Sequence, residues 1–196
     1  MTQPITQILD FWFGDLDDRG FSTAEKHKLW FTVSDSTDQQ CKQLFGALVE
    51  QAVAGKLNRW ADKDEGLIAL VLLLDQFTRN IFRGTPAAFS GDDRALALSQ
   101  EAVEHGRDQR LPAIHRVFLY MSLEHSEDLL VQETSVNCFA ELAAQTGDKM
   151  FEGFCQYAQA HKDVVSSFGR FPHRNSILGR ESTQQELEHL GTHGGF

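Results

Sequence analysis

Cysteine is scarce in this sequence, and its three copies do not form any recognisable pair. Cys41, Cys138 and Cys155 are odd in number and widely spaced, with no Cys-x-x-Cys motif among them. Each falls on the apolar stripe of an expected helix, which favours buried, reduced thiols without chemical function. Reduced thiols are typical of the cytosol, so we expect a cytoplasmic protein.

Long apolar segments are also lacking. The longest run, at residues 67–74, has eight residues, whereas a membrane-spanning helix needs about 20. The first seven residues contain no basic segment followed by an apolar one, so we expect no signal peptide. The run at 67–74 is instead expected at the buried centre of a helix, and we expect no membrane partner.

Positive charge is in the minority. The 18 lysines and arginines stand against 28 aspartates and glutamates, which gives a formal charge of −10. A field of that sign repels nucleic acid and anionic membrane surfaces, so we expect no nucleic-acid partner. With 41% hydrophobic residues the chain has material for one core. We therefore expect a single domain over residues 1–190 and a frayed tail at 191–196.

No stretch shows the alternation or the Asn-Gly and Asp-Gly turns of β-hairpins. Capping boxes, first-turn prolines and terminal glycines instead mark helices along the whole chain. One of them, at about residues 65–82, is apolar on all sides in its first half, which places it at the centre of the fold. The expected fold class is all-α, a compact stack of antiparallel helical hairpins of tetratricopeptide-like type with eight or nine helices.

The second half of this central helix changes character. Asp75, Arg79 and Arg83 are spaced i, i+4 and i+8, and Gln76 forms a parallel row with Asn80. A polar stripe on a buried helix predicts a water-filled cavity or a buried hydrogen-bond network. The alternative is structural: an Asp75–Arg79 salt bridge and compensation of the helix dipole at the C-terminal end.

A junction between two expected helices concentrates ionisable groups at residues 122–128, Ser-Leu-Glu-His-Ser-Glu-Asp. Glu127 and Asp128 fit an acidic first helical turn, which the positive end of a helix stabilises. Glu124 and His125 precede that turn. A carboxylate beside an imidazole can raise the pKa of the imidazole and orient it for proton transfer.

The richest segment begins at His161 and continues through residues 168–180, Phe-Gly-Arg-Phe-Pro-His-Arg-Asn-Ser-Ile-Leu-Gly-Arg. His161 lies on the apolar stripe of its helix, so its ring should point inward, either as a satisfied core residue or as a ligand-binding group. The loop after it presents three arginines, a histidine and an asparagine within eleven positions. In an acidic protein they imply local anionic partners, either the chain's own carboxylates or a bound phosphate or carboxylate.

These segments carry a family resemblance. Residues 11–14 (Phe-Trp-Phe-Gly), 74–80 (Leu-Asp-Gln-Phe-Thr-Arg-Asn), 123–128 (Leu-Glu-His-Ser-Glu-Asp) and 168–180 resemble, in this order, the family called domain of unknown function 924. The similarity runs over essentially the whole chain, and its last motif is long enough to be specific. The resemblance implies an all-α, tetratricopeptide-like fold found mostly in bacteria. It implies no established activity and no catalytic residues.

The leading functional hypothesis is a polar pocket where the three segments converge and bind a small anionic ligand bearing phosphate or carboxylate. Acid–base catalysis is a further expectation. The expected ligand-binding residues are Asp75, Arg79, Asn80, Arg83, Arg170, Arg174, Asn175 and Arg180. The expected catalytic residues are Glu124, His125, His161 and His173.

The sequence leaves other functions open. It contains no Gly-x-Ser-x-Gly, no P-loop and no His-Glu-x-x-His, so it does not decide whether the chain is an enzyme. The alternative function is a tetratricopeptide-like scaffold that binds a protein or an acidic peptide. The same groups could also form a polar network that only specifies the fold. Arginines oppose a cation, so we expect no metal, and we expect no cofactor. The oligomeric state is open.

Overall fold

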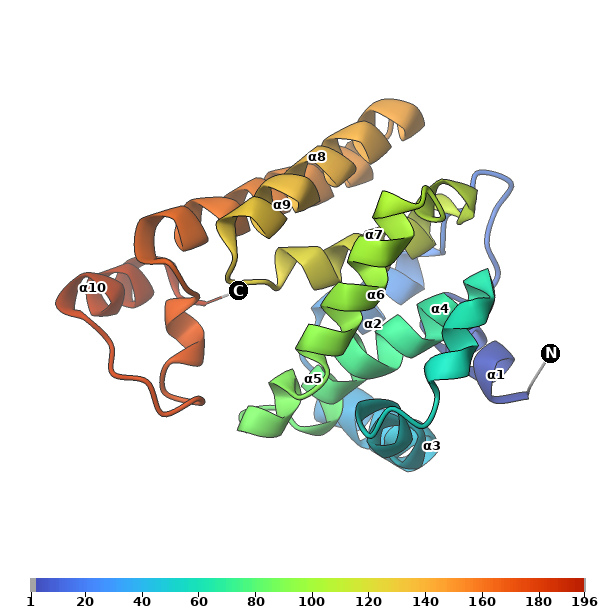
Figure 1. Ribbon diagram of the computed structural model, residues 1–196, viewed down its shortest axis with the longest axis horizontal. Helices are drawn as coiled ribbons and strands as arrows, with labels where there is room; N and C mark the ends of the chain where they lie inside the picture. The colour runs from blue at the N-terminus through green and yellow to red at the C-terminus, as the bar shows by residue number, and fades with distance from the viewer. Residues whose placement is uncertain (1–2, 196) are drawn as a thin grey trace. The chain divides into compact units, whose positions relative to one another are not determined.

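Figure 1 shows the computed structural model of the chain, which describes residues 3–195. Every regular element in that range is helical. The segments labelled α1–α10 make nine helices, because α4 and α5 are joined through a continuous π-helical turn. The prediction of an all-α fold with eight or nine helices is confirmed.

The chain divides into two compact units. The first comprises the residues up to Arg83 together with Ala87–Ser122, and the second comprises Gly84–Pro86 and the residues from Leu123 onward. The single domain expected over residues 1–190 stays a prediction, as does the tetratricopeptide-like arrangement of hairpins. No helix within residues 3–195 is long and apolar enough to span a membrane.

The first unit is built on the central helix that the sequence predicts at residues 65–82. This helix consists of α4 (Asp64–Val71), the π turn (Leu72–Phe77) and α5 (Thr78–Ile81). The other helices of this part of the chain are α1 (Gln3–Trp12), α2 (Ala24–Phe31), α3 (Asp35–Val53), α6 (Asp92–Glu104) and α7 (Ala113–Glu124). Short 3₁₀ turns lie at Asn58–Asp62, Pro86–Phe89 and Asp108–Arg110. Helices α1, α3 and α6 pack against the central helix.

The core of the first unit follows the apolar run of the sequence. Residues 67–74 are at most 1% exposed, and burial of each such side chain stabilises the fold by about 1.5–3 kcal/mol. Aromatic rings fill the space beside them: the Trp12 ring lies 5.1 Å from that of Phe77 and 5.6 Å from that of Phe118, both in edge-to-face geometry. The prediction that this run is the buried centre of a helix is confirmed.

The π turn at Leu72–Phe77 is a feature that the sequence did not predict. It lies where the helix passes the start of α6, and a Cβ atom on Gly91 would stand only 2.1 Å from the carbonyl oxygen of Leu74. Glycine at position 91 therefore permits a backbone approach that no other residue would allow. Asp75 lies inside the turn and is fully buried. Single π turns within α-helices are frequent at functional sites.

The second unit contains the hairpin of α8 (Leu129–Thr146) and α9 (Lys149–Phe168), which lie side by side in Figure 1. Gly147 ends α8 with a φ of 61°, and the Asp148 carboxylate caps α9 by accepting the Met150 N–H at 2.9 Å. A connection this short makes the two helices antiparallel.

The C-terminal part of this unit holds the 3₁₀ turn η5 (Pro172–Arg174) and α10 (Gln184–His193). Thr183 and Glu186 form the predicted capping box at the start of α10. Residues 191–193, expected in a frayed tail, form the last turn of this helix. A Cβ atom on Gly195 would stand 2.7 Å from the His173 Cβ, so the backbone there lies against His173. Phe196 lies outside the described residues.

At the start of two helices, only one of several adjacent capping residues is used. The side chain of Ser34, and not Ser36, caps α3 by accepting the Thr37 N–H at 3.4 Å. Asp128, and not Ser126, caps α8 by accepting the N–H groups of the second and third helical residues at 2.8 and 3.2 Å. In both cases the sequence offered several adjacent capping residues, and tertiary packing selected the one used.

Candidate functional site

Arg79 in the first unit is held by the protein's own acceptors. Its guanidinium donates two parallel hydrogen bonds to Asp92, at 2.9 and 3.0 Å, and a third to the Ala88 carbonyl at 2.8 Å. Asp75 lies 3.8 Å from the same guanidinium. Burial works against the charge of Arg79, but Asp75 and Asp92 outweigh it and raise its pKa. This arrangement fixes the arginine between α5 and the start of α6.

Arg83 and Asn80 meet a single carboxylate on α3. Asp38 accepts two hydrogen bonds from Arg83, at 2.7 and 2.9 Å, and one from the Asn80 amide at 2.7 Å. Burial raises the pKa of Asp38, but these donors outweigh it and lower the pKa below its ordinary value. The polar stripe of the central helix therefore ties α5 to α3 and α6, which favours its structural interpretation.

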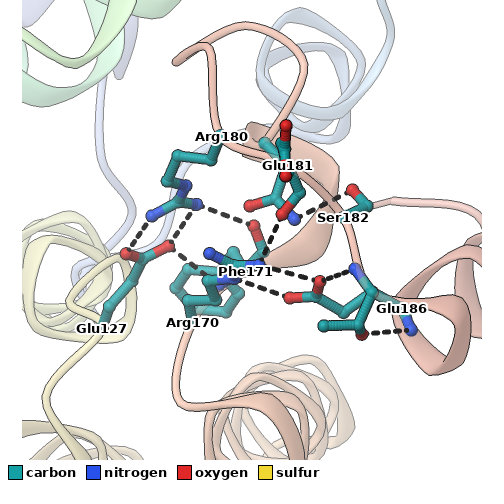
Figure 2. A network of polar contacts seen from close by, with 9 residues as sticks. Glu127, Arg170, Phe171, Arg180, Glu181, Ser182 and Glu186 are labelled. Atoms are coloured by element: carbon teal, nitrogen blue, oxygen red, sulfur yellow. Dashed lines mark hydrogen bonds and ion pairs between the residues drawn. The ribbon is translucent and has the colours of Figure 1, made fainter.

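A second carboxylate organises the loop of the second unit, as Figure 2 shows. Glu127 accepts two hydrogen bonds from Arg180, at 2.7 and 3.0 Å, and one from the backbone N–H of Phe171 at 2.8 Å. Arg180 also donates to the Phe171 carbonyl at 3.1 Å. Burial raises the pKa of Glu127, but Arg180 and the Phe171 N–H outweigh it, so the pKa is lowered. The ion pair thus closes the loop around Phe171.

Arg170 forms the other ion pair in Figure 2. It donates to both carboxylate oxygens of Glu186, at 2.6 and 2.9 Å, and to the Glu181 carbonyl at 2.8 Å. The Thr183 N–H donates to Glu186 at 2.7 Å. Arg170 lowers the pKa of Glu186 to about 2, with burial opposing it and the Thr183 N–H adding to it. Asn175, fully buried, donates to Ser182 at 3.0 Å.

His161 lies apart from these ion pairs, on the inner face of α9. It is 4% exposed, and its Nδ1 atom is 3.0 Å from the Tyr157 carbonyl oxygen and 3.4 Å from the Glu124 carboxylate. A carbonyl oxygen only accepts, so Nδ1 carries the hydrogen and Nε2 carries the lone pair. The His125 ring is 6.4 Å away, centroid to centroid. A buried imidazole is thus oriented by two acceptors on one side.

Phe171 joins His161 to the η5 turn. Its fully buried ring lies 5.5 Å from the His161 ring and 5.7 Å from the His173 ring. The guanidinium carbon of Arg174 stands 4.5 Å above the centre of the same ring, a cation–π contact, and Arg174 is itself 7% exposed. The residues Glu124, His125, His161, Phe171, His173 and Arg174 are called the histidine cluster below.

The surroundings of His161 favour the neutral form of its ring. The pKa of His161 is lowered to about 3, chiefly by burial; His125, His173 and Arg174 add to this effect, and the hydrogen bond to the Tyr157 carbonyl opposes it. Arg174 brings a guanidinium beside this buried ring in a chain whose formal charge is −10. A small anion placed there would be stabilised by the guanidinium and by N–H donors of the neighbouring imidazoles.

The family model for "Bacterial protein of unknown function (DUF924)" matches residues 8–194. The chain belongs to this family. A solved structure from Agrobacterium tumefaciens, of the protein of unknown function ATU0120, is similar to it, with 33% sequence identity and a TM-score of 0.79. The similarity covers 96% of this chain and 97% of that one. No curated protein matches the sequence.

Five residues expected at the site come together in the second unit of this DUF924 protein: Glu124, His125, His161, His173 and Arg174. Two further expected residues of that unit, Arg170 and Arg180, bind its own carboxylates, and Asn175 bonds to Ser182. The expected residues of the first unit form a separate network, namely Asp75, Arg79, Asn80 and Arg83. Convergence of all three segments stays a prediction.

Sequence reasoning missed two aromatic members of this region. Phe171 centres the cluster, and the Tyr157 ring lies 5.4 Å from that of His161. The signal for Tyr157 was its position one helical turn before His161. Glu127, expected in an acidic first turn, instead binds Arg180, whereas Asp128 does cap α8. Within residues 3–195 no group of three or more His, Cys, Asp and Glu side chains is placed to hold a metal ion.

Proposed function

We propose that the histidine cluster binds a small anion bearing a phosphate or carboxylate group. The observation that carries this proposal is the grouping of His125, His173 and Arg174 around the His161 and Phe171 rings. They lie beside a nearly buried imidazole in an otherwise acidic chain. A guanidinium and imidazoles together supply directional donors to an anion's oxygens.

The other arginines of the expected site have well-defined structural partners. Arg79, Arg83, Arg170 and Arg180 each form two hydrogen bonds with a carboxylate of the same chain. Their charges already serve the fold, so we assign them structural roles. Arg174 instead stands over the Phe171 ring within the cluster.

Acid–base catalysis follows as the second part of the proposal, with His161 as the proton acceptor. Its Nδ1–H is directed at the Tyr157 carbonyl and Glu124, so Nε2 is the ring nitrogen with the lone pair that would accept a substrate proton. A pKa of about 3 makes the free ring a weak base. Burial is the main cause of this low pKa, and a bound anion would counter it by stabilising the protonated ring, which raises the pKa toward the range in which proton transfer at neutral pH is efficient.

The test is calorimetric titration with inorganic phosphate and with acetate, on the wild type and on Arg174→Lys and His173→Gln. Lysine keeps the charge but loses the fork of donors, so we expect roughly tenfold weaker binding in Arg174→Lys. A thermal-shift measurement gives an independent readout: saturation at about 100 times the dissociation constant adds roughly 2.7 kcal/mol, or several degrees.

Arg170→Lys is the matched control, because Arg170 lies in the same loop but is bound to Glu186. It should lower stability without changing the affinity for phosphate. If the wild type binds neither anion, or if the Arg174 and Arg170 variants weaken binding equally, the cluster is a structural network and the proposal is wrong. The tetratricopeptide-like peptide scaffold stays a prediction.

A further inference from the structure

An exposed aromatic ring lies beside His161 of the histidine cluster. Tyr157 is 56% exposed, whereas His161, one turn later on α9, is 4% exposed. Residues at i and i+4 share a face of a helix, and the two ring centroids are 5.4 Å apart with an interplanar angle of 48°. The tyrosine therefore stands at the rim of the buried face that carries the imidazole.

Tyr157 and His161 are also coupled through the backbone. The Tyr157 carbonyl accepts the hydrogen bond that orients the His161 ring, at 3.0 Å. The His161 ring also lies 5.5 Å from the Phe171 ring, in edge-to-face geometry, and the Phe171 ring faces Arg174. The imidazole thus contacts both a buried aromatic ring that holds a cation and an aromatic ring that is exposed to solvent.

An exposed tyrosine ring offers a flat, rigid apolar face with little conformational entropy to lose on binding. A ligand whose acidic group meets Arg174 and the imidazoles of the cluster can extend toward Tyr157, the exposed ring beside His161. A planar group in that place can stack on the tyrosine ring, and stacking of this kind strengthens binding beyond the anion contact alone.

We propose that Tyr157 is the stacking surface of the anion site and that the ligand is an acidic group joined to a planar ring, as in an aryl phosphate or an aryl carboxylate. This inference rests on the anion site proposed above. It goes beyond that site by assigning the substrate class and a residue that selects it.

The experiment compares ligands with and without the ring by calorimetry. Phenyl phosphate is paired with inorganic phosphate, and benzoate with acetate, on the wild type, Tyr157→Phe and Tyr157→Ala. We expect the ring to tighten wild-type binding roughly two- to tenfold. Tyr157→Phe should keep this gain and Tyr157→Ala should lose it, while the affinity for inorganic phosphate or acetate is the same in all three. A gain in either pair supports the proposal and identifies the acidic group.

Phe31→Ala is the matched control, because Phe31 is an aromatic residue of similar exposure, 53%, in the first unit. It should leave the gain intact. Equal ring gains in the wild type and Tyr157→Ala, or no gain at all, would overturn the inference while the anion site stands. Equal weakening of both ligands in Tyr157→Ala would also overturn it, because the tyrosine would then act on the cluster and not on the ring. Absence of any anion binding by the wild type overturns both proposals.

Discussion

The Arg170–Glu186 pair should decide the local stability of α10. Glu186 is the single residue of this helix that is buried, at 2% exposure. It binds both Arg170 and the Thr183 N–H. Few apolar contacts hold the helix, so removal of the Glu186 charge should loosen it selectively. The perturbation we choose is Glu186→Gln, which keeps the size and shape of the side chain but removes its charge.

The stability that the Glu186 charge contributes can be calculated from the pKa of Glu186. A carboxyl held at about 2 against an ordinary 4.5 corresponds to about 3 kcal/mol at most. We expect about 1–2 kcal/mol, because the Arg170 side chain is 28% exposed and solvent screens the pair. This contribution is fully present above the unfolded pKa. It is lost as the pH falls from about 5 toward the folded pKa, because the unfolded state then binds the proton first.

Hydrogen exchange of the α10 amides is the assay, because it measures local opening and does not require the whole chain to unfold in one step. At pH 7 the amides of Gln184–His193 should exchange roughly five- to thirtyfold faster in Glu186→Gln than in the wild type. At pH 3 the difference in opening free energy should be less than half as large. Glu188→Gln, on the exposed side of the same helix, is the control and should change little. Equal protection of wild type and Glu186→Gln at pH 7 would refute the reasoning.

Two further predictions concern His161 and the π turn. Without an anion, the ¹⁵N chemical shifts of the His161 ring should show the Nδ1–H form, with no titration between pH 5 and 8. The folded pKa of about 3 lies below the unfolded value, so the wild type should lose stability as the pH falls from about 6.5 toward 3. The His161→Gln variant should lose less stability over the same pH range. Gly91→Ala should destabilise the first unit by about 1–3 kcal/mol in urea denaturation followed by tryptophan fluorescence, because the new Cβ atom would stand 2.1 Å from the Leu74 carbonyl oxygen. Gly153→Ala is the control: Gly153 lies in open space inside α9, so this variant should be more stable by about 0.5–1 kcal/mol. Equal stability of the Gly91 variant and the wild type would mean that the close approach is not needed.

The fold was predictable wherever short-range rules determine the structure. The apolar side chains at 67–74 avoid water only if they are buried in a core, and they are buried. The capping pattern of Thr183 and Glu186 is local in sequence, and it forms a capping box. The π turn was not predictable, because it depends on how closely Gly91, distant in sequence, approaches Leu74. Nor could the caps be chosen among neighbouring serines and aspartates, since their propensities are nearly equal.

The sequence predicted candidate site residues but could not predict their partners, and the arginines show why. Arg79 pairs with a carboxylate 13 positions away, Arg170 with one 16 away, and Arg83 and Arg180 with partners 45 and 53 away. Side-chain pairs at such separations depend on tertiary packing, and no periodicity encodes them. A sequence can therefore show that guanidinium groups gather in a loop without showing which of them the protein's own carboxylates neutralise.

The aromatic neighbours of an arginine indicate its role better than the number of arginines in a segment does. Phe171, three residues before Arg174, lies under its guanidinium and beside His161, and so selects one arginine of the loop for the cluster. A ring holds a cation without cancelling its charge, whereas a carboxylate cancels it. This difference is the reason that the proposed test compares Arg174, which stands over the Phe171 ring, with Arg170, which is bound to Glu186.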